Sequence, residues 1–449
     1  MFTVDKSILS FFLLLIIFSF LNNIKSNIIV FPFKTEPSNP RISNYIDSFT
    51  KNQIYITVNI GSPSQNINLY LTMSTNYLII ANSSIDPSYY NSKQSSTYES
   101  ISSYSDYLTE YLDKGYFAKE SFIFKTGFNE NDKKKFDNVE FALITGFGMA
   151  NQKAPGYFGL QLPKKNKQNI YNCLKRENII DEYYWNIKYT SDLEGYFILG
   201  GYPPDYGEEK FIKTSNALPC DEGDANLCWN LRFNDIKFGE IDVNRDRTAE
   251  IRPELGFIVG TGEYKQKISD NFFDKLGDKC KKEYSDTSYE YFVCKENTDL
   301  SNFINLEFVH PDFNYKFIMT KDDLFKKYGE EIYFQIIFDK YSPQGTHWKL
   351  GKPFLKKYNF GFNTDSKKIY FYNEDKEHSE GYLVYYIVIG VLIIGIMGMI
   401  TFVVVNKIIK PKRKKANELT DEINFSNNNN ANSNENENND NANQNFLGV

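Results

Sequence analysis

The sequence contains very few histidines, and their isolation excludes several kinds of catalytic centre. Only three occur among 449 residues: His310, His347 and His378. They do not form the spaced set of ligands that a metal site needs, and the chain has no nucleophile elbow and no P-loop. A formal net charge of −6 gives no electrostatic reason to expect nucleic-acid binding. We therefore expect no metal, no cofactor and no nucleic-acid partner.

Long hydrophobic runs are absent from the central part of the chain and occur only near its two ends. Residues 8–21 form an apolar run behind Lys6 that is too short to cross a membrane comfortably. Polar residues follow it, and this pattern predicts a signal peptide at residues 1–26. Residues 382–405 form a run of roughly two dozen residues, enough to cross ~30 Å of hydrocarbon as one helix.

Lysine and arginine gather directly after the second apolar run, at residues 407–415. The positive-inside rule therefore predicts that this end is cytoplasmic. We expect a single-pass type I membrane protein whose bulk is lumenal or extracellular, in the secretory pathway, a vacuole or lysosome, or at the cell surface. Residues 406–449 are rich in Asn, Glu and Asp and lack apolar periodicity, which predicts a disordered cytoplasmic tail.

Cysteine is scarce, with five residues in the whole chain. In an exported protein this number predicts disulfides plus one thiol left over. Cys220 and Cys228 are close enough in sequence to close a small loop, and Cys280 and Cys294 bracket a turn-like stretch that they would close as a hairpin. Cys173 would then be free and buried on a helix. Five cysteines allow several connectivities, so this pairing is one of several.

Helical patterns are also rare between residues 42 and 372, where short alternating apolar runs are separated by Gly, Pro, Asn and Asp. The best helical patterns are residues 169–177 and 270–282. Many strands and few helices over this length predict an all-β protein of two lobes. The runs most typical of strands are residues 54–58, 121–124, 139–144, 196–199 and 368–372.

Several motifs resemble, in the same order along the chain, those of pepsin-like aspartic proteases. Residues 60–65, IGSPSQ, resemble the I-G-T-P-P-Q turn before that family's first active-site strand. Residues 197–206 resemble the L-x-L-G-G-x-D-x-x-x-Y signature between the lobes. Residues 348–358, WKLGKPFLKKY, resemble W-x-L-G-D-x-F-L-R-x-Y. Further matches lie at residues 44–47, 92–98, 115–120 and 155–160.

The resemblance implies two similar β lobes, at residues 42–195 and 196–375, with a cleft between them that a hairpin flap closes. The stretch at residues 27–41 would be a short pro-like segment. Cys280 and Cys294 fall where the family commonly has a disulfide. A peptide or protein is the ligand that such a cleft would hold.

The two aspartates on which the family's chemistry depends are missing. Thr72 stands where the first hydrophobic-D-T-G motif has Asp, and Gly260 stands there in the second. The family's mechanism needs two carboxylates that share one proton. A threonine hydroxyl does not ionise near neutral pH, and glycine has no side chain. Ser74, Thr261 and Gly262 follow these positions and are expected to line the cleft.

The sequence gives no reason to expect that other carboxylates replace the two missing aspartates. Glu254, Glu263 and Asp270 lie near the second motif, but none has the spacing to reach the axis between the lobes from both sides. No intact catalytic residue is therefore expected.

The sequence also predicts a flap tyrosine and a glycosylation site. The family's flap tyrosine corresponds best to Tyr107, with Tyr104 and Tyr111 as alternatives. Asn82, in the triplet Asn-Ser-Ser, is the one lumenal glycosylation sequon.

Three functions are consistent with the sequence. The first is a membrane-anchored pepsin-like homologue that binds peptides or proteins without cleaving them. The second is an active aspartic endopeptidase, and the third is a lumenal or surface receptor or adhesion protein.

Overall fold

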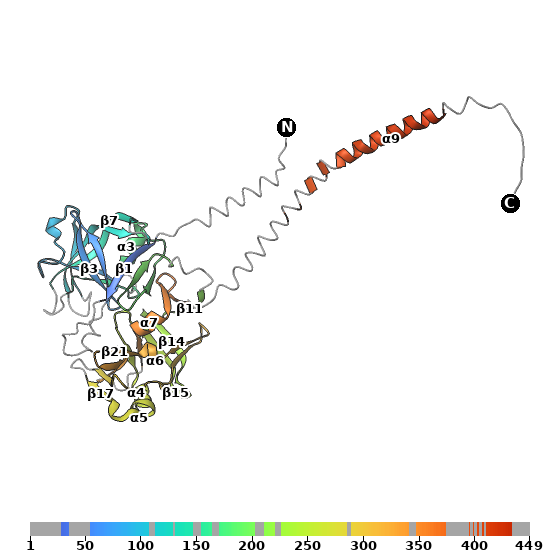
Figure 1. The fold of residues 1–449 in the computed structure, drawn as a ribbon. Helices are drawn as coiled ribbons and strands as arrows, with labels where there is room; N and C mark the ends of the chain where they lie inside the picture. The colour runs from blue at the N-terminus through green and yellow to red at the C-terminus, as the bar shows by residue number, and fades with distance from the viewer. Residues whose placement is uncertain are drawn as a thin grey trace, which may run out of the picture. The chain divides into compact units, whose positions relative to one another are not determined.

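The computed structural model describes two units of the chain, Met1–Lys376 and Glu377–Val449 (Figure 1). Within them, the residues described are 28–35, 54–106, 113–128, 131–146, 154–163, 170–202, 211–220, 226–284, 289–340, 347–373, 395, 398, 402–403, 406–407 and 410–432. The predicted signal peptide at residues 1–26 lies outside them.

The first unit is built mainly of two large β-sheets, which confirms the all-β, two-lobed prediction. One sheet has 13 strands in the order β11-β26-β25-β9-β10-β1-β2-β3-β8-β4-β7-β6-β5. Its strands are β1 (Ile29–Thr35), β2 (Ile54–Ile60), β3 (Gln65–Thr72), β4 (Leu78–Ala81), β5 (Glu99–Asp106), β6 (Asp113–Lys125), β7 (Lys133–Gly146), β8 (Gly156–Gly159), β9 (Tyr184–Tyr189), β10 (Glu194–Leu199), β11 (Phe211–Asn216), β25 (Asn359–Asn363) and β26 (Lys368–Tyr372).

The other large sheet has 11 strands, in the order β20-β19-β14-β15-β24-β16-β23-β18-β22-β21 with β17 paired to β18. In Figure 1 its labelled strands β14, β15 and β17 lie in the part of the unit opposite β3 and β7. Its strands are β14 (Asn230–Phe238), β15 (Ile241–Ile251), β16 (Ile258–Gly260), β17 (Cys280–Tyr284), β18 (Tyr289–Lys295), β19 (Leu306–His310), β20 (Tyr315–Met319), β21 (Phe325–Tyr328), β22 (Glu331–Phe334), β23 (Ile336–Asp339) and β24 (Trp348–Leu350). A third, two-stranded sheet pairs β12 (Leu218–Pro219) with β13 (Leu227–Cys228).

Short helices connect the strands, and they occur close to where the sequence predicts them. The first is α3 (Ile170–Arg176), within the predicted residues 169–177. The second prediction is corrected, because the helical turns begin earlier, with α4 (Gly262–Ile268), and end at Lys279. The other α-helices among the described residues of this unit are α5 (Asp274–Leu276), α6 (Lys321–Leu324) and α7 (Lys352–Lys357).

The five runs predicted as strands are confirmed, but the boundary between the lobes is corrected. The predicted division between residues 195 and 196 falls inside β10, which pairs with β9 and β1 over its whole length. Strands β25 and β26, from the end of the unit, return to the same sheet. The two lobes therefore share one sheet rather than being separable at a single point in the sequence.

The predicted pro-like segment, residues 27–41, contributes strand β1 to that sheet. β1 alternates buried and exposed side chains over its second half and pairs with β10 on one side and β2 on the other. The sheet therefore begins before the predicted start of the first lobe at residue 42. Whether this segment is removed by processing stays a prediction.

Aromatic side chains join the two halves in one continuous core. Trp185 on β9 stacks on Phe362 of β25, with ring centroids 3.9 Å apart. The indole nitrogen of Trp229, on the C-terminal side, donates a hydrogen bond of 2.8 Å to the carbonyl of Leu160. All four side chains are buried. This packing fixes how the strands of the two halves meet around the site described below.

The predicted disulfides Cys220–Cys228 and Cys280–Cys294 are confirmed, and Cys173 is free and buried on α3. Cys280 and Cys294 lie directly opposite each other on β17 and β18. Disulfides of this kind are typical of secreted or lumenal proteins.

Removing the Cys280–Cys294 bond with paired alanine substitutions is expected to lower the free energy of unfolding by about 3 kcal/mol. The bond closes a segment of 14 residues, and without it the unfolded chain regains that loop entropy. Denaturant titration of the variant and the wild type measures the loss. The Cys220→Ala/Cys228→Ala variant, whose loop spans 8 residues, should lose slightly less. A loss below about 1 kcal/mol for Cys280→Ala/Cys294→Ala would contradict this account.

His310, at the end of β19, is buried, with 1% of its surface exposed. Its ring stacks on Phe313 with centroids 4.1 Å apart, and its Nδ1 accepts a hydrogen bond from the Phe313 amide. Burial lowers the pKa of His310 to about 4, although the charge of Asp312 opposes that shift. The folded protein therefore holds a neutral imidazole that the unfolded chain protonates below about pH 6.5.

Stability is expected to fall by about 3 kcal/mol as the pH drops from 7 to 4, because the unfolded state binds a proton there that the folded state does not. Denaturant titrations of the wild type and His310→Phe at both pH values isolate this contribution. The variant should lose correspondingly less stability on acidification. Equal pH dependence of the two proteins would show that His310 is not the group responsible.

The second unit contains a helix where the sequence predicts disorder. Helix α9 runs over Lys410–Asn432 and is exposed along its described side chains. Lys, Arg, Ala, Glu and Leu dominate its first half, and these residues favour helix. The lack of apolar periodicity excludes a packed core but not a helix, so the prediction for residues 406–449 is corrected over this range.

Most of the predicted membrane span, residues 382–405, lies outside the described residues. Among the residues that are described, no helix is both long enough and apolar enough to cross a membrane.

Candidate functional site

Thr72 ends strand β3 at the centre of the first large sheet. β3 pairs in parallel with β8, which places Thr72 opposite Gly159. The chain then turns and returns as β4, which pairs antiparallel with β8, with Ile79 opposite Tyr157. Within the turn, the amide of Gln161 donates to the carbonyl of Thr75 at 3.0 Å. These pairings define a strand–turn–strand unit packed around β8.

The same unit recurs in the second large sheet, one strand earlier than the sequence motif suggests. β15 pairs in parallel with β24, and β16 then pairs antiparallel with β24 through Val259 and Lys349. The amide of Lys352 donates to the carbonyl of Leu255 at 2.8 Å. The carbonyl of Leu255 has the same place in the unit as that of Thr75, although the donor lies one residue earlier after the paired strand.

The repeated pattern makes Arg252, not Gly260, the counterpart of Thr72. Thr75 lies three residues after Thr72, and Leu255 lies three residues after Arg252. Ile79 pairs with β8 and lies seven residues after Thr72. Val259 pairs with β24 and lies seven residues after Arg252. The prediction that Gly260 occupies the second catalytic position is therefore wrong.

Gly260 instead ends β16 and precedes a helix. Thr261 caps α4, accepting a hydrogen bond from the amide of Tyr264 and donating one of 2.9 Å to Asn244. Gly262 is the first residue of that helix. Both partners of Thr261 lie in its own half of the protein, so these contacts do not connect the two lobes. Thr261 and Gly262 are therefore not assigned to the centre of the site.

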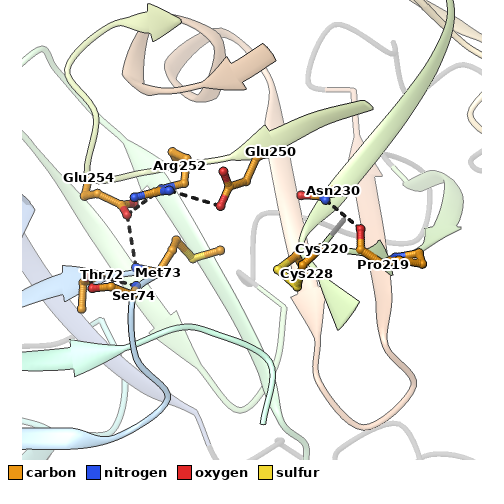
Figure 2. A network of polar contacts seen from close by, with 10 residues as sticks. All are labelled: Thr72, Met73, Ser74, Pro219, Cys220, Cys228, Asn230, Glu250, Arg252 and Glu254. Carbon is orange, nitrogen blue, oxygen red and sulfur yellow. Dashed lines mark hydrogen bonds and ion pairs between the residues drawn. A yellow bond between two sulfur atoms is a disulfide. The ribbon is translucent and has the colours of Figure 1, made fainter. Parts of the chain in front are cut away.

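At the centre, a carboxylate from the second half reaches the first. Figure 2 shows Glu254 beside the turn at Met73, with Arg252 between Glu254 and Glu250. The amide of Met73 donates to Glu254 Oε1 at 3.3 Å, and Arg252 Nε donates to the same oxygen at 2.8 Å. A second guanidinium nitrogen of Arg252 lies 3.2 Å from Glu250 Oε1. The two counterpart turns thus meet through the carboxylate of Glu254, which Arg252 also binds from its own half.

The electrostatics of this contact depend on burial. The Glu254 side chain is 11% exposed, and its second oxygen has no hydrogen-bond partner among the described residues. Burial raises the pKa of Glu254 above its ordinary value of 4.5, and the charge of Arg252 partly offsets that shift. Attraction to Glu254 and Glu250 outweighs the opposing effect of burial and raises the pKa of Arg252. Burial and the Glu254 charge also raise the pKa of Tyr189.

On the other side of the contact, the hydroxyls of Thr72 and Ser74 bond to each other. Their oxygens are 2.7 Å apart, and the amide of Ser74 also donates to the Thr72 hydroxyl at 3.2 Å. Thr72 is buried, and Ser74 stands where a tight turn favours glycine. Among the described residues, neither hydroxyl is bonded to a group that would take its proton.

The arrangement lacks what the pepsin-like mechanism requires. A guanidinium is always protonated in proteins, so Arg252 does not act as a general base. Among the residues described around this contact, no two carboxylates are hydrogen-bonded to each other, because Arg252 lies between Glu250 and Glu254. In the described ranges, no group of three or more His, Cys, Asp or Glu side chains is arranged to hold a metal ion.

The predicted flap is only partly described. Strands β5 and β6 form its hairpin, but Tyr107 and Tyr111 fall in the gap between residues 106 and 113. Tyr104, the other candidate, packs its ring against Phe117 of β6 with centroids 4.9 Å apart. Burial raises the pKa of its hydroxyl. Tyr104 is therefore a packing residue of the hairpin.

Asn82, the predicted glycosylation site, follows β4 and is half-buried. Its amide nitrogen donates to Ser92 at 3.1 Å, and its oxygen accepts from the amide of Ser84. A glycan on Asn82 would displace the first of these bonds. Modification of Asn82 stays a prediction.

The sequence motif hid Arg252 and Glu254 because Gly260-Thr261-Gly262 resembles the end of a D-T-G motif more closely than Arg252-Pro253-Glu254 does. The signal that would have found them is the seven-residue spacing from Thr72 to Ile79, repeated from Arg252 to Val259.

Comparisons with known proteins agree with the fold. The profile of the family described as eukaryotic aspartyl protease matches residues 53–373. None of the curated proteins matches the sequence. Among solved structures, conglutin gamma, a basic 7S globulin from lupine seeds, has a TM-score of 0.57 at 11% identity, covering 78% of this chain and 96% of that one. Identity this low shows a shared fold only. Because the family match spans well over half of the chain, this protein belongs to the eukaryotic aspartyl protease family.

Proposed function

We propose that this protein is a membrane-anchored, catalytically inactive member of its family that binds a peptide or protein between its lobes. The observation that supports the proposal is the pair of residues at the two counterpart positions, Thr72 and Arg252. Neither residue activates a water molecule, and the nearest carboxylate, Glu254, is bound by Arg252 and by the amide of Met73. Single-pass anchoring through residues 382–405 belongs to the same proposal.

General acid and base help is worth roughly 10²–10⁴ in rate for each group. The two carboxylates of the family act as a unit, so replacing both removes the mechanism rather than slowing it. The 13-stranded sheet shared by the two lobes does not need these carboxylates to hold the turns after Thr72 and Arg252 in place. The scaffold is thus preserved for a role that does not need hydrolysis.

The full-length protein, purified in detergent, is tested on a degenerate peptide library between pH 3 and 7. We expect retention of a subset of peptides and no cleavage. Peptide cleavage that a transition-state inhibitor of aspartic proteases abolishes would establish the alternative, an active endopeptidase. Retention of no peptide but of one folded lumenal protein would favour the receptor or adhesion role instead.

A further inference from the structure

Positive charge is concentrated at the start of helix α9, Lys410–Asn432 (Figure 1). No acidic residue occurs between residues 406 and 417, whereas six lysines and arginines lie between 407 and 415. We call these six the basic segment: Lys407, Lys410, Lys412, Arg413, Lys414 and Lys415. The chain as a whole carries a net charge of −6, so this local charge runs against the average of the protein.

The positive charges of the basic segment are exposed and close to one another. All six side chains are exposed, and none of them forms an ion pair within the part of the chain that the structure describes. Lys410 and Lys414 lie four residues apart, where side chains are neighbours on the surface of a helix and like charges are destabilising. Negative charge placed against the segment would remove that repulsion.

An apolar stripe continues along α9 beyond the basic segment. Ala416, Leu419 and Ile423 have the spacing i, i+3 and i+7, which places them on one side of a helix. The side chain of Leu419 is 62% exposed and that of Ile423 is 54% exposed, so both face solvent. The acidic side chain of Asp421 lies about 160° around the helix from both of them. Helix α9 therefore joins a basic start to an amphipathic continuation.

The proposed membrane span, residues 382–405, ends two residues before the basic segment begins. In the proposed topology this end of the span is cytoplasmic. Anionic lipids of the cytoplasmic leaflet produce a negative surface potential that attracts basic residues next to a membrane span. The charge of the segment thus matches the surface beside which the proposed anchor would place it.

We propose that α9 binds the cytoplasmic surface of the membrane through anionic phospholipid headgroups. The basic segment contacts the headgroups, and the stripe of Ala416, Leu419 and Ile423 enters the boundary between headgroups and acyl chains. Asp421 then points away from the anionic surface. The inference rests on the proposed membrane anchoring and is independent of whether the lobes bind a peptide.

A fluorophore sensitive to polarity, attached to Leu419→Cys in the full-length protein, tests the proposal. Cys173 is buried and the other four cysteines form disulfides, so the added thiol is the accessible one. The protein is reconstituted into vesicles of phosphatidylcholine alone, and of phosphatidylcholine and phosphatidylserine in equal parts. We expect emission to shift to shorter wavelength only with phosphatidylserine, and high salt to reverse the shift by screening the charges.

Matched variants separate charge from position. The variant K412Q/R413Q/K414Q/K415Q, with the two lysines nearest the span left in place, should reduce the shift about threefold or more. The variant K412R/K414R/K415R keeps the charge and should retain the shift. The same fluorophore on Asn417→Cys, about 160° around the helix from Leu419, should shift less than on Leu419→Cys.

Alkaline extraction of the phosphatidylcholine vesicles tests the anchor separately, because a spanning protein is retained and a peripheral one is released. Release would contradict the proposed anchor, and labelled protein mixed with the two kinds of vesicle from outside would still report on α9. Equal emission with and without phosphatidylserine, or an unchanged shift in the glutamine variant, would overturn the proposal. An acidic protein would then be the partner that matches the charge of the basic segment.

Discussion

Replacing Arg252 by methionine is expected to lower the free energy of unfolding by about 3 kcal/mol or more at neutral pH. The substitution leaves Glu254 buried, with only the amide of Met73 to offset its charge. Breaking a buried ion pair from one side costs more than removing the pair, because the remaining charge has lost both water and partner. The double variant Arg252→Met/Glu254→Gln should therefore recover much of the lost stability.

The loss of stability in Arg252→Met should also depend on pH. The direction of this dependence follows from the raised pKa of Glu254. The folded state holds a proton on Glu254 at pH values where the unfolded chain, with an ordinary value of 4.5, has released it. Stability therefore falls as the pH rises above 4.5 and returns on acidification. The hydroxyl of Tyr189 stays neutral between pH 4 and 7, because burial and the charge of Glu254 raise its pKa. Tyr189 therefore does not contribute to this pH dependence.

Denaturant titrations at pH 4 and pH 7 measure this dependence for the wild type, the single variant and the double variant. Arg245→Met is the matched control, because Arg245 pairs with Asp242 on the surface and its side chain is 73% exposed. An exposed ion pair typically contributes about 0–1 kcal/mol to stability. The free energy of unfolding of the control should therefore change little. If Arg252→Met were as stable as Arg245→Met and showed the same pH dependence, Glu254 would not be buried as described.

Much of the fold follows from local patterns in the sequence. Alternating runs such as residues 54–58 and 368–372 become strands because one face of each is buried. The disulfides were also predictable, since Cys220 and Cys228 are close in sequence and Cys280 and Cys294 bracket a hairpin. Pairing between distant strands is not local, which is why the sequence did not indicate that β1 and β25 belong to one sheet.

The candidate site was predictable in one half and not in the other. In the first half, the turn before Gln65 and the strand that ends at Thr72 keep the family's spacing. In the second half, the motif has changed at each position that defines it, and a helix-capping segment imitates it. The pairing of β15 and β16 with β24 is what identifies Arg252 as the counterpart of Thr72. Strand pairing shows which positions correspond even where the residue types have changed.

The position of Gly260 provides a second test with a large expected effect. A Cβ atom added there would lie 2.8 Å from Cε1 of Phe338 and 2.9 Å from Cγ2 of Ile336, both of which are buried on β23. Gly260→Ala is therefore expected to cost about 1–3 kcal/mol through overpacking. Gly260→Asp adds a carboxylate with no partner in an apolar setting, and it should cost more than about 3 kcal/mol or prevent folding.

Gly146→Ala and Gly146→Asp are the matched controls, because no atom of the described residues lies within 4 Å of the Cβ that they would add on β7. Both should stay within about 0.5 kcal/mol of the wild type. The comparison also tests the assignment of the site, since a position built for a catalytic aspartate would accept one without loss. A Gly260→Asp protein as stable as Gly146→Asp would show that Gly260 does not lie in the apolar setting described. The expected loss instead agrees with the strand register, which makes Arg252 the counterpart of Thr72.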